Sequence, residues 1–424
     1  MPEDSASKTI SERIEDANRR AADLLTKAQP TWVDVMPARD FIPGFKENLV
    51  LFAGPPLDPR HALKPVRNAI AGAAVQEGLA KTVEEAWEMV LRDEIILGAM
   101  LDYKSAGGGF SPVTASTPVL VVEDTATGSR GCCVIYEGSE AELLRWGFYT
   151  PKIADRLTWF QDELGPVLGE MVRAMGGLNI RNILAQATGM GDENHYRNTA
   201  SNALMMFQML PALVELPLKH DVLKRVTRFL GGYERFFLHV LLGGAVAVTN
   251  TVKGIECSTL MIAIGGNGYE FGMKFADTGD QWFRVKAPKF TGVYLNPKWT
   301  DDEMCPFIGD SCMVEAYGFG GLAAAAGAAV VRMTGGDFRD ALRRTEEARQ
   351  VCVASHDWAP IPWLDFQGPP CGIDMRKVVG TGIAPIVHGG MAHVNGGQGG
   401  GGYCRLPMDC FVQGLRAFAA KRGL

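Results

Sequence analysis

The sequence lacks any apolar run long enough to cross a membrane. Its longest apolar stretches, such as FLHVLLGGAVAVTN at 237–250, fall short of the roughly 20 residues required and contain glycines, so we expect buried helices. It also lacks a charge excess: the net charge of -6 is spread without long like-charge blocks, which argues against nucleic acid or membrane partners. The first 25 residues have no apolar segment of the secretory type and predict a charged amphipathic helix and a cytoplasmic protein.

Cysteine spacings typical of disulfide or zinc proteins are missing as well. The nine cysteines are an odd number, include the adjacent pair Cys132 and Cys133, and contain no C-x-x-C. Neither a disulfide framework nor a zinc ribbon is indicated, and we expect most of them to be small buried residues in a reducing compartment. No P-loop, G-x-S-x-G, H-E-x-x-H or Rossmann glycine pattern occurs, and no metal site or cofactor is predicted, although a divalent metal is not excluded.

Glycine is abundant, with 50 residues, and it interrupts two separate groups of strand-like segments. Helical patterns lie between these groups, so the sequence predicts an α+β (mixed α/β) fold with two α/β domains and a small all-helical subdomain between them. The expected parts are an N-terminal helix and Pro-containing connector (1–45), an α/β domain (46–190), a helical subdomain (191–250) and a Gly-rich α/β domain (251–424).

Local signals place several elements. The run NLVLFAG predicts a short buried strand, and two β-branched runs around residue 126 predict a hairpin. Thr82 with Glu85, and Ser139 with Glu142, have the spacing of capping boxes and predict helix starts. Long helical patterns follow from about 151 to 186.

The densest polar cluster is TGMGDENHYRN at 188–198. If Asp192 caps a helix running through this stretch, His195 and Asn198 share one face, while Glu193 and Arg197 stand four apart as a surface ion pair. The alternative is that these side chains form a wall that binds an anion or an amide. Both interpretations remain open on spacing alone.

A second cluster, at 380–411, contains two histidines and a run of glycines. His388 and His393 lie five apart, which suits neither one helical face nor one strand face, so a metal pair is not indicated. The run NGGQGGGG is expected to form neither a stable helix nor a packed strand. We favour a backbone cradle that approaches a ligand over a flexible tip. The candidate binding residues here are His388, Asn395, Gln398, Gly399 and Gly400.

Two weaker candidates remain. Asp310 and Glu315 precede GFGG and suit either simple turns or an anion site, and the triple glycine with Gly108 and Gly109 suits either an oxyanion pocket or a mobile loop. The isolated histidines are expected to be core or surface residues: His61, His220, His239 and His356.

Taken in order, the motifs AQATGMGDENHYRNTA, YEFGMKFADTGDQWFRVKAP, IGDSCMVEAYGFGG and TGIAPIVHGGMAHVNGGQGGGGYCRLPMDCF resemble the YlbE-like family. This family includes the large AllG-type subunit of bacterial oxamate carbamoyltransferase, and the resemblance covers roughly residues 45–420. Its first motif, M-G-D-E-x-H-N-R-N, is matched at Asp192, Glu193, His195, Arg197 and Asn198. Its last, T-G-I-A-H followed by G-Q-I-G-A-G, maps onto His393, Gln398 and Gly399.

The resemblance implies a mixed α/β body with a small helical subdomain. It also implies chemistry at a carbamoyl or amide carbon, in the AllG case within a multisubunit enzyme that exchanges oxalurate and phosphate for oxamate and carbamoyl phosphate. The chain departs from the family in two places. LDYKSAGGGFSPVTA has no histidine where the family has a His-rich loop, and Gln398 is followed by four glycines.

The predicted function is therefore an enzyme acting at the C–N bond of a small carbamoyl, amide or lactam substrate, by carbamoyl transfer or hydrolysis, at a site between domains. The expected partner is a small ureido, amide or lactam compound. His195 or His393 is expected as the base, with Glu193 or Asp192 orienting the histidine. Arg197 and the glycine-loop N–H groups are expected to bind the developing oxyanion. The alternative is a non-catalytic scaffold in a multisubunit carbamoyltransferase. Phosphate or carbamoyl phosphate is a possible substrate, and a homo-oligomer or partner subunits are expected.

Overall fold

The N-terminal helix is present in the computed structural model, which describes residues 8–424. Helix α1 (Ile10–Lys27) starts at Thr9, whose hydroxyl accepts the N–H of Glu12 while the Glu12 carboxylate accepts the N–H of Thr9. This reciprocal cap satisfies two N–H groups that have no partner inside the helix. The first seven residues of the predicted helix lie outside the described part of the chain.

The largest sheet has the order β4-β6-β5-β1-β7 and confirms the predicted hairpin between β5 and β6. Its strands are β1 (Pro30–Pro37), β4 (Ser105–Ala106), β5 (Pro118–Asp124), β6 (Ser129–Val134) and β7 (Leu178–Asn179). The expected Pro-containing connector is wrong at 30–37, because β1 pairs with both β5 and β7. Trp32, Val33 and Val35 favour a strand, and the two prolines stand at its ends, where they interrupt no ladder.

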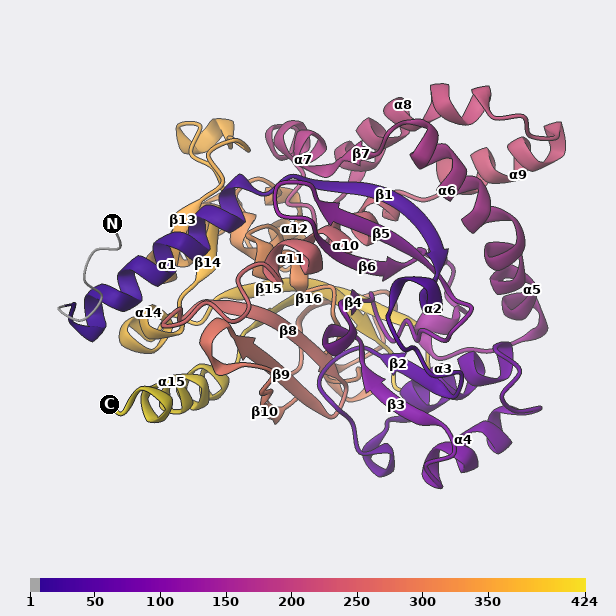
Figure 1. Ribbon diagram of the computed structural model, residues 1–424, viewed down its shortest axis with the longest axis horizontal. Coiled ribbons are helices and arrows are strands. Elements are labelled where there is room, and N and C mark those ends of the chain that lie inside the picture. Colours follow the sequence, from indigo (N-terminus) through magenta and orange to yellow (C-terminus); the bar gives the residue numbers. More distant parts are fainter. Residues whose placement is uncertain (1–7) are drawn as a thin grey trace.

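Four further sheets complete the mixed α/β architecture of the described residues, so the predicted class is confirmed (Figure 1). Their orders are β10-β9-β8-β12, β11-β16-β15, β13-β14 and the parallel pair β2-β3. The strands are β2 (Leu49–Phe52), β3 (Ile96–Ala99), β8 (Met261–Asn267), β9 (Glu270–Phe275), β10 (Phe283–Lys286), β11 (Thr291–Tyr294), β12 (Ile308–Gly309), β13 (Cys352–Ser355), β14 (Pro370–Ile373), β15 (Ile386–Ala392) and β16 (Gln398–Arg405).

Strand β16 contradicts the expectation that NGGQGGGG cannot form a packed strand. It lies between β11 and β15 and is buried over 399–402. A Cβ on Gly400 would come within 2.2 Å of the carbonyl oxygen of Val293, and one on Gly402 within 2.2 Å of that of Thr291. The glycines are therefore required by the close approach of neighbouring strands, a role that outweighs their entropic cost.

Helix α10 (Phe236–Thr249) is the central helix of the fold, and every one of its residues is buried. It packs against β5 and β6 of the largest sheet and against the short helix α11 (Met313–Tyr317) that follows Asp310. In Figure 1, α10 and α11 lie in the middle of the molecule, between the largest sheet and β8 to β10. Helices occupy much of the predicted helical region 191–250, but residues 191–198 are not helical, and α10 belongs to the core of the large sheet.

The other helices cover the outside of the sheets. Helices α8 and α9 project at the upper right edge in Figure 1, and α1 and α15 lie at the left. Their bounds are α2 (Ala38–Phe41), α3 (Lys64–Gln76), α4 (Val83–Leu91), α5 (Pro151–Trp159), α6 (Gly165–Ala174), α7 (Ile180–Gly189), α8 (Thr199–Glu215), α9 (His220–Gly231), α12 (Ala328–Met333), α13 (Phe338–Val351), α14 (Met375–Thr381) and α15 (Met408–Arg422).

One predicted helix start is confirmed and one is wrong. Thr82 caps α4 by accepting the N–H of Glu85. The segment at Ser139 and Glu142 forms no α-helix, because only a 3-10 turn follows, at Leu144–Trp146. There the carboxylate of Glu137 binds two backbone N–H groups of the turn, which holds the chain in a loop conformation.

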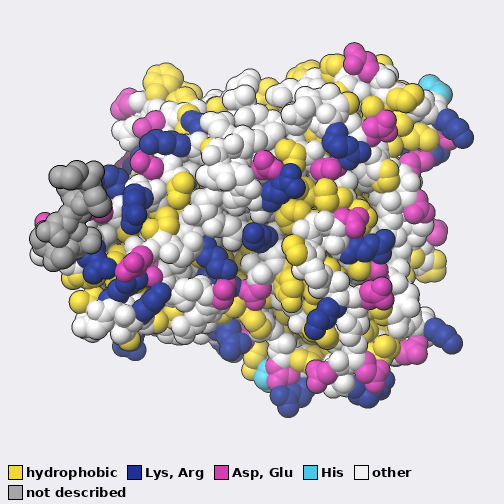
Figure 2. All heavy atoms as spheres, in the orientation of Figure 1, with side chains coloured by type: hydrophobic (Ala, Val, Ile, Leu, Met, Phe, Trp, Pro, Cys, Tyr) yellow, Lys and Arg dark blue, Asp and Glu magenta, His cyan; other side chains and the backbone are white. Residues whose placement is uncertain are grey.

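The interior divides into a large hydrophobic core around α10 and a smaller one under α3 and α4. All nine cysteines lie in the described part of the chain, and each is buried and unpaired, as predicted. None of the described helices has the length and apolar character needed to span a membrane. On the face in Figure 2, basic and acidic side chains are interspersed over the surface.

Candidate functional site

The polar cluster at 192–198 forms a buried loop, and the helix expected to run through it is wrong. Helix α8 begins only at Thr199, and Asn194 adopts a left-handed conformation with φ 68°. The carboxylate of Glu193 accepts the backbone N–H groups of three consecutive residues: His195, Tyr196 at 2.7 Å and Arg197 at 3.1 Å. These bonds replace the helical ones and fold the loop around Glu193.

Asp192 still accepts a backbone N–H of the first turn of α8, although it precedes the N-cap residue Asn198 by six positions. Its Oδ2 accepts the N–H of Ser201 at 2.9 Å, and its Oδ1 accepts Nε of Arg197 at 3.1 Å. The predicted ion pair between Glu193 and Arg197 is therefore wrong, since Asp192 is the partner of Arg197. Burial raises the pKa of Asp192 above its ordinary value. Asn198 supports the loop by donating to the carbonyl of His195 at 2.8 Å.

His195 is held by Glu315 of α11, and the prediction that Glu193 or Asp192 orients its ring is wrong. Nδ1 of His195 lies 2.8 Å and 2.9 Å from the two carboxylate oxygens of Glu315. The same carboxylate accepts the N–H groups of Gly321 and His388, both at 2.9 Å. Nε2 of His195 has no hydrogen bond within residues 8–424. The pair thus presents one free imidazole nitrogen, as a base or proton carrier requires.

Glu193 and His388 complete this reaction cluster, which we define as Glu193, His195, Glu315 and His388. Nδ1 of His388 lies 3.4 Å from Oε1 of Glu193, and all four side chains are buried. Burial raises the pKa of Glu193, but the hydrogen bond and charge of His388 and the charge of His195 outweigh burial and lower it. Burial lowers the pKa of His195, but the charge and hydrogen bond of Glu315 outweigh burial and raise it.

Two glycines allow the reaction cluster to pack this closely. A Cβ on Gly320 would lie 2.2 Å from Oε1 of Glu315, and one on Gly327 would lie 2.5 Å from Cγ of Glu193. Gly320 has φ +61° and donates its N–H to the carbonyl of Glu193 at 2.7 Å. Gly320 and Gly321 of the GFGG motif therefore fit against the carboxylate of Glu315, and the motif opens only the 3-10 helix Gly320–Ala323. The predicted anion site there stays a prediction.

A second group of buried polar side chains surrounds the turn at Gly107–Gly109. Asp310 donates its N–H to the carbonyl of Gly107 at 2.9 Å and accepts the N–H of Gly54 on Oδ1 at 2.7 Å. Nε2 of His239 and Nη1 of Arg145 lie 3.3 Å and 3.9 Å from the point where a Cβ on Gly108 would stand. We call Arg145, His239 and Asp310 the turn cluster.

Sequence reasoning missed His239 and Arg145. His239 is the single charged or titratable residue in the otherwise apolar helix FFLHVLLGGAVAVT, and a polar residue in such a helix is the signal that was available. Arg145 offers no comparable signal, because its burial depends on the rings of Tyr136 and Trp146, 4.5 Å and 4.9 Å from its guanidinium carbon. Only the tertiary fold brings these two rings against the guanidinium of Arg145.

Arg235 acts on both clusters. Its charge influences the pKa of His195 and the pKa of Arg145. Its guanidinium carbon lies 4.5 Å from the ring of Tyr196. The hydroxyl of Tyr196 contacts β16, where a Cβ on Gly401 would lie 2.0 Å from it. On the neighbouring strand β15, a Cβ on Gly390 would lie 3.4 Å from the ring of Trp146. The glycine-rich strands thus run beside both groups.

Several predicted residues lie outside these clusters. His393 is only partly buried, packs on Trp299 with ring centroids 4.6 Å apart and accepts the N–H of Asn395 at 3.1 Å. Asn395 is exposed, and Gln398 donates to the carbonyl of Gly400 at 3.4 Å. The predicted backbone cradle is wrong for Gly399 and Gly400. The carbonyl of Gly399 accepts the N–H of Leu295, and Gly400 is paired on both sides in the three-stranded sheet.

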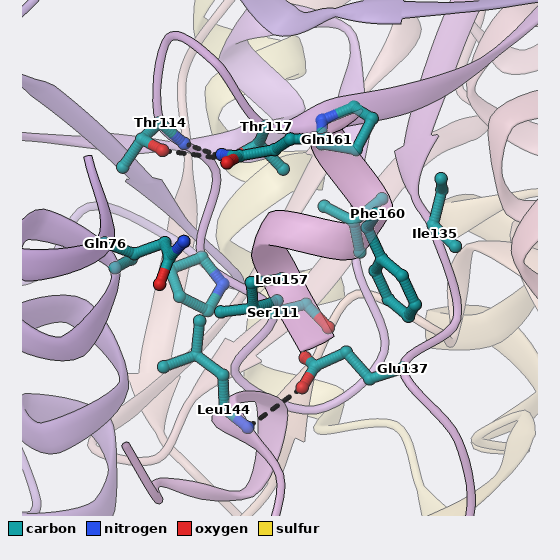
Figure 3. Close-up of a pocket in the computed structure, with 14 residues that line it drawn as sticks. Gln76, Ser111, Thr114, Thr117, Ile135, Glu137, Leu144, Leu157, Phe160 and Gln161 are labelled. Atoms are coloured by element: carbon teal, nitrogen blue, oxygen red, sulfur yellow. Dashed lines mark hydrogen bonds between the residues drawn. The ribbon is translucent and has the colours of Figure 1, made fainter. Parts of the chain in front are cut away.

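A small cavity is lined by Ser111, Glu137, Leu144 and Phe160, among other residues (Figure 3). Its volume is about 40 Å³, and Ser111, which lines it, donates to the carbonyl of Gly108. Glu137, at its edge in Figure 3, accepts the N–H groups of Leu144 at 2.9 Å and Arg145 at 3.0 Å. Burial raises the pKa of Glu137 to about 7, against the charge of Arg145. Glu137 therefore positions the backbone of Arg145.

Among residues 8–424, no three or more His, Cys, Asp or Glu side chains are grouped as metal ligands. The expectation that no metal is needed stays a prediction.

The model of the family "Oxamate carbamoyltransferase subunit AllG" matches residues 95–311. The oxamate carbamoyltransferase subunit AllG of Escherichia coli (strain K12) is 32% identical over 97% of this chain and 99% of its own length. The uncharacterized protein YahG of the same organism is 29% identical over 99% of this chain and 89% of its own length. A crystal structure of a conserved protein of unknown function from Enterococcus faecalis V583 superposes with a TM-score of 0.94 at 31% identity, covering 98% of this chain and 99% of that one.

Proposed function

The chain belongs to the family of the oxamate carbamoyltransferase subunit AllG, and on that premise we propose that it carries the reaction centre for carbamoyl transfer between a small amide and phosphate. The relative's name identifies oxamate as the amide. The reverse substrate is then an oxalurate-type ureido compound. Phosphate is the second substrate, and the proposal names no cofactor.

The observation that carries the proposal is the buried pair of His195 and Glu315, in which Nε2 of His195 has no hydrogen-bond partner among the described residues. In the transfer from the ureido compound, a phosphate oxygen attacks the carbamoyl carbon and the bond from that carbon to the oxamate nitrogen breaks. Nε2 accepts the proton from phosphate and delivers it to the leaving nitrogen. One C–O bond replaces one C–N bond, and the proton ends on the amide product.

Glu315 supports this role by keeping the ring in one orientation and by stabilising the imidazolium form through its charge. It raises the pKa of His195, so the rate in the direction that uses the neutral ring increases as pH rises through that pKa. The hydrogen bonds from Gly321 and His388 to Glu315 fix the carboxylate in turn. His195 is the proposed catalytic residue, and Glu315 is a positioning residue.

We propose that partner subunits complete the enzyme, because the named relative is a subunit. Only 2% of the surface of His195 is exposed, which favours opening of the site by a partner or by substrate. This burial also favours the second candidate, a binding subunit without chemistry of its own. The nine unpaired cysteines support the proposed cytoplasmic location, since free thiols persist in reducing compartments.

The test is phosphate release from carbamoyl phosphate in the presence and absence of oxamate, by the chain alone and by the complex with its co-purified partners. We expect His195→Ala to lower the oxamate-dependent rate about 10²- to 10⁴-fold. His220→Ala is the matched control, because His220 is exposed at the start of α9, and it should leave the rate unchanged. Equal rates for His195→Ala and wild type would favour the binding subunit.

A further inference from the structure

The turn cluster contains a buried cation that forms no ion pair within residues 8–424. Arg145 is 5% exposed, and its Nε has no hydrogen-bond partner in this part of the chain. Burial lowers the pKa of Arg145 against the charges of Tyr136 and Glu137, and the carboxylate of Glu137 already accepts two backbone N–H groups. Burying a charge costs free energy unless the charge is paired. An anionic group of a ligand would therefore stabilise Arg145.

His239 contributes an unused hydrogen-bond acceptor to the same place. Its Nδ1 lies 2.8 Å from the carbonyl oxygen of Val134, which can only accept, so Nδ1 carries the proton. Nε2 is therefore the unprotonated nitrogen, and it is buried without a partner. Burial and the charge of Arg145 lower the pKa of His239 to about 3, which keeps the ring neutral.

Asp310 contributes an unused donor. Its Oδ1 accepts the N–H of Gly54, while Oδ2 is buried without a partner. Burial raises the pKa of Asp310 well above its ordinary value and so favours the protonated carboxyl, and the unpartnered Oδ2 is the oxygen from which a proton can be donated to a ligand. Nδ1 of His239 also lies 3.5 Å from Sγ of Cys133.

Gly108 has no side chain where His239 and Arg145 approach it. A Cβ there would lie 3.3 Å from Nε2 of His239 and 3.9 Å from Nη1 of Arg145, so both nitrogens face the same side of Gly108. A ligand that bonds to both nitrogens would lie beyond the position of this Cβ, and a side chain at 108 would crowd it. The absence of a side chain at 108 is therefore part of the geometry.

We propose that Arg145, His239 and Asp310 form a subsite around Gly107–Gly109 for a small ligand that carries a primary amide next to a carboxylate. The amide N–H donates to Nε2 of His239, the amide oxygen accepts from Oδ2 of Asp310, and the carboxylate pairs with Arg145. Oxamate has this arrangement of groups. The choice of oxamate rests on the proposed function, whereas the pattern of donor, acceptor and cation does not.

The test is isothermal titration of the full-length chain with oxamate, and with oxalate, which replaces the amide by a second carboxylate. We expect wild type to bind oxamate at least about tenfold more tightly than oxalate, since oxalate offers no N–H to His239. Gly108→Ala should weaken oxamate about tenfold or more by filling the subsite. Gly380→Ala, with no atom within 4 Å of the new Cβ, is the matched control and should bind as wild type does.

A second pair of variants guards against misfolding. Asp310→Asn keeps one acceptor for Gly54 and one donor for the ligand, so it should retain oxamate binding, whereas Asp310→Ala should lose it. Circular dichroism of each variant checks the fold. Wild-type affinity for oxamate in Gly108→Ala, or equal binding by Asp310→Asn and Asp310→Ala, would overturn the subsite, as would the absence of saturable binding by wild type up to about 10 mM.

The outcome separates this inference from the proposed function. Binding is measured without turnover, so the loss of turnover in His195→Ala and the loss of binding in Gly108→Ala are separate observations. Loss of turnover in His195→Ala with unchanged binding in Gly108→Ala keeps the proposed function and overturns the subsite. Oxamate binding that Gly108→Ala abolishes, in a complex that transfers no carbamoyl group, supports the subsite and overturns the proposed function.

Discussion

His195 and His239 are both buried, yet their environments favour opposite protonation states. Glu315 raises the pKa of His195, whereas burial lowers the pKa of His239 to about 3. The carboxyl groups differ in the same way, since the pKa of Glu193 is lowered and that of Asp310 is raised well above its ordinary value. The reaction cluster favours charged groups, and the acid and imidazole of the turn cluster are neutral.

The cause of the difference is the number of partners. In the reaction cluster each carboxylate accepts three hydrogen bonds or more, and a histidine stands beside each. In the turn cluster the carboxyl of Asp310 accepts one backbone hydrogen bond, and the imidazole of His239 donates one. Burial is therefore the main influence on the pKa of both groups. Charged paired groups suit proton movement, and neutral unpaired groups suit recognition of a neutral amide. Three changes test this comparison.

The largest expected effect is on stability, from Glu315→Ala. The substitution removes the acceptor for Nδ1 of His195 and for the N–H groups of Gly321 and His388, so we expect a loss of about 3–5 kcal/mol in the free energy of unfolding. Urea denaturation measures it. Glu315→Gln keeps an acceptor oxygen and should cost clearly less. A loss below about 1 kcal/mol for Glu315→Ala would contradict the paired description of the reaction cluster.

The next effect is the pH dependence of stability that His239 contributes. Its folded pKa of about 3 lies below the unfolded value of about 6.5, so the unfolded chain binds the extra proton between these values and stability is lost as pH falls. Relative to His239→Gln, wild type should lose about 2 kcal/mol of unfolding free energy between pH 7 and pH 5. Urea denaturation of both proteins at the two pH values measures this difference. His220→Gln, on the surface, should give no such difference, and an equal response of His239→Gln and wild type would refute a neutral buried ring.

The smallest effect is expected at the edge of the reaction cluster, from Asp192→Asn. The amide oxygen can still accept the N–H of Ser201, but the charge-assisted bond to Arg197 is lost, so we expect a cost of about 1 kcal/mol. Thermal unfolding measures it. Asp221→Asn, in the exposed first turn of α9, serves as control and should stay within about 0.5 kcal/mol. Equal effects of the two substitutions would show that Asp192 acts as an ordinary surface cap.

Sequence reasoning succeeded where the determinants are local. The cap of α4 at Thr82, the hairpin of β5 and β6 and the helices that follow Asn198 depend on residues close together in the chain. The polar cluster at 188–198 is visible without a structure for the same reason, because its polar residues are adjacent in the sequence. Asp310 and Glu315 are candidates from their glycine-rich surroundings and also lie in a motif that resembles the AllG-type family, and the family match confirms the family.

The remainder depends on contacts between distant segments. Glu315 reaches His195 across 120 positions, so spacing favoured the nearby Glu193 and Asp192 as its partners. The sequence predicts a loop where β16 lies, because glycine is a poor strand former. Glycine is favoured in a strand only where the neighbouring strands leave no room for a side chain. Arg145 and His239 became neighbours of Gly108 only through packing. Contacts between side chains far apart in the sequence are thus what a single sequence does not predict.

Strand β16 has a consequence for protein engineering. At Gly400 and Gly402 the Cβ of even the smallest substitution would come within 2.2 Å of the backbone oxygens of Val293 and Thr291, and at Gly401 within 2.0 Å of the hydroxyl of Tyr196. A library that diversifies this stretch therefore has no usable alternatives at Gly400 and Gly402, and a substitution of Gly401 requires the Tyr196 side chain to move. The repeated glycines look like low-complexity sequence, yet they are among the least replaceable letters in the chain.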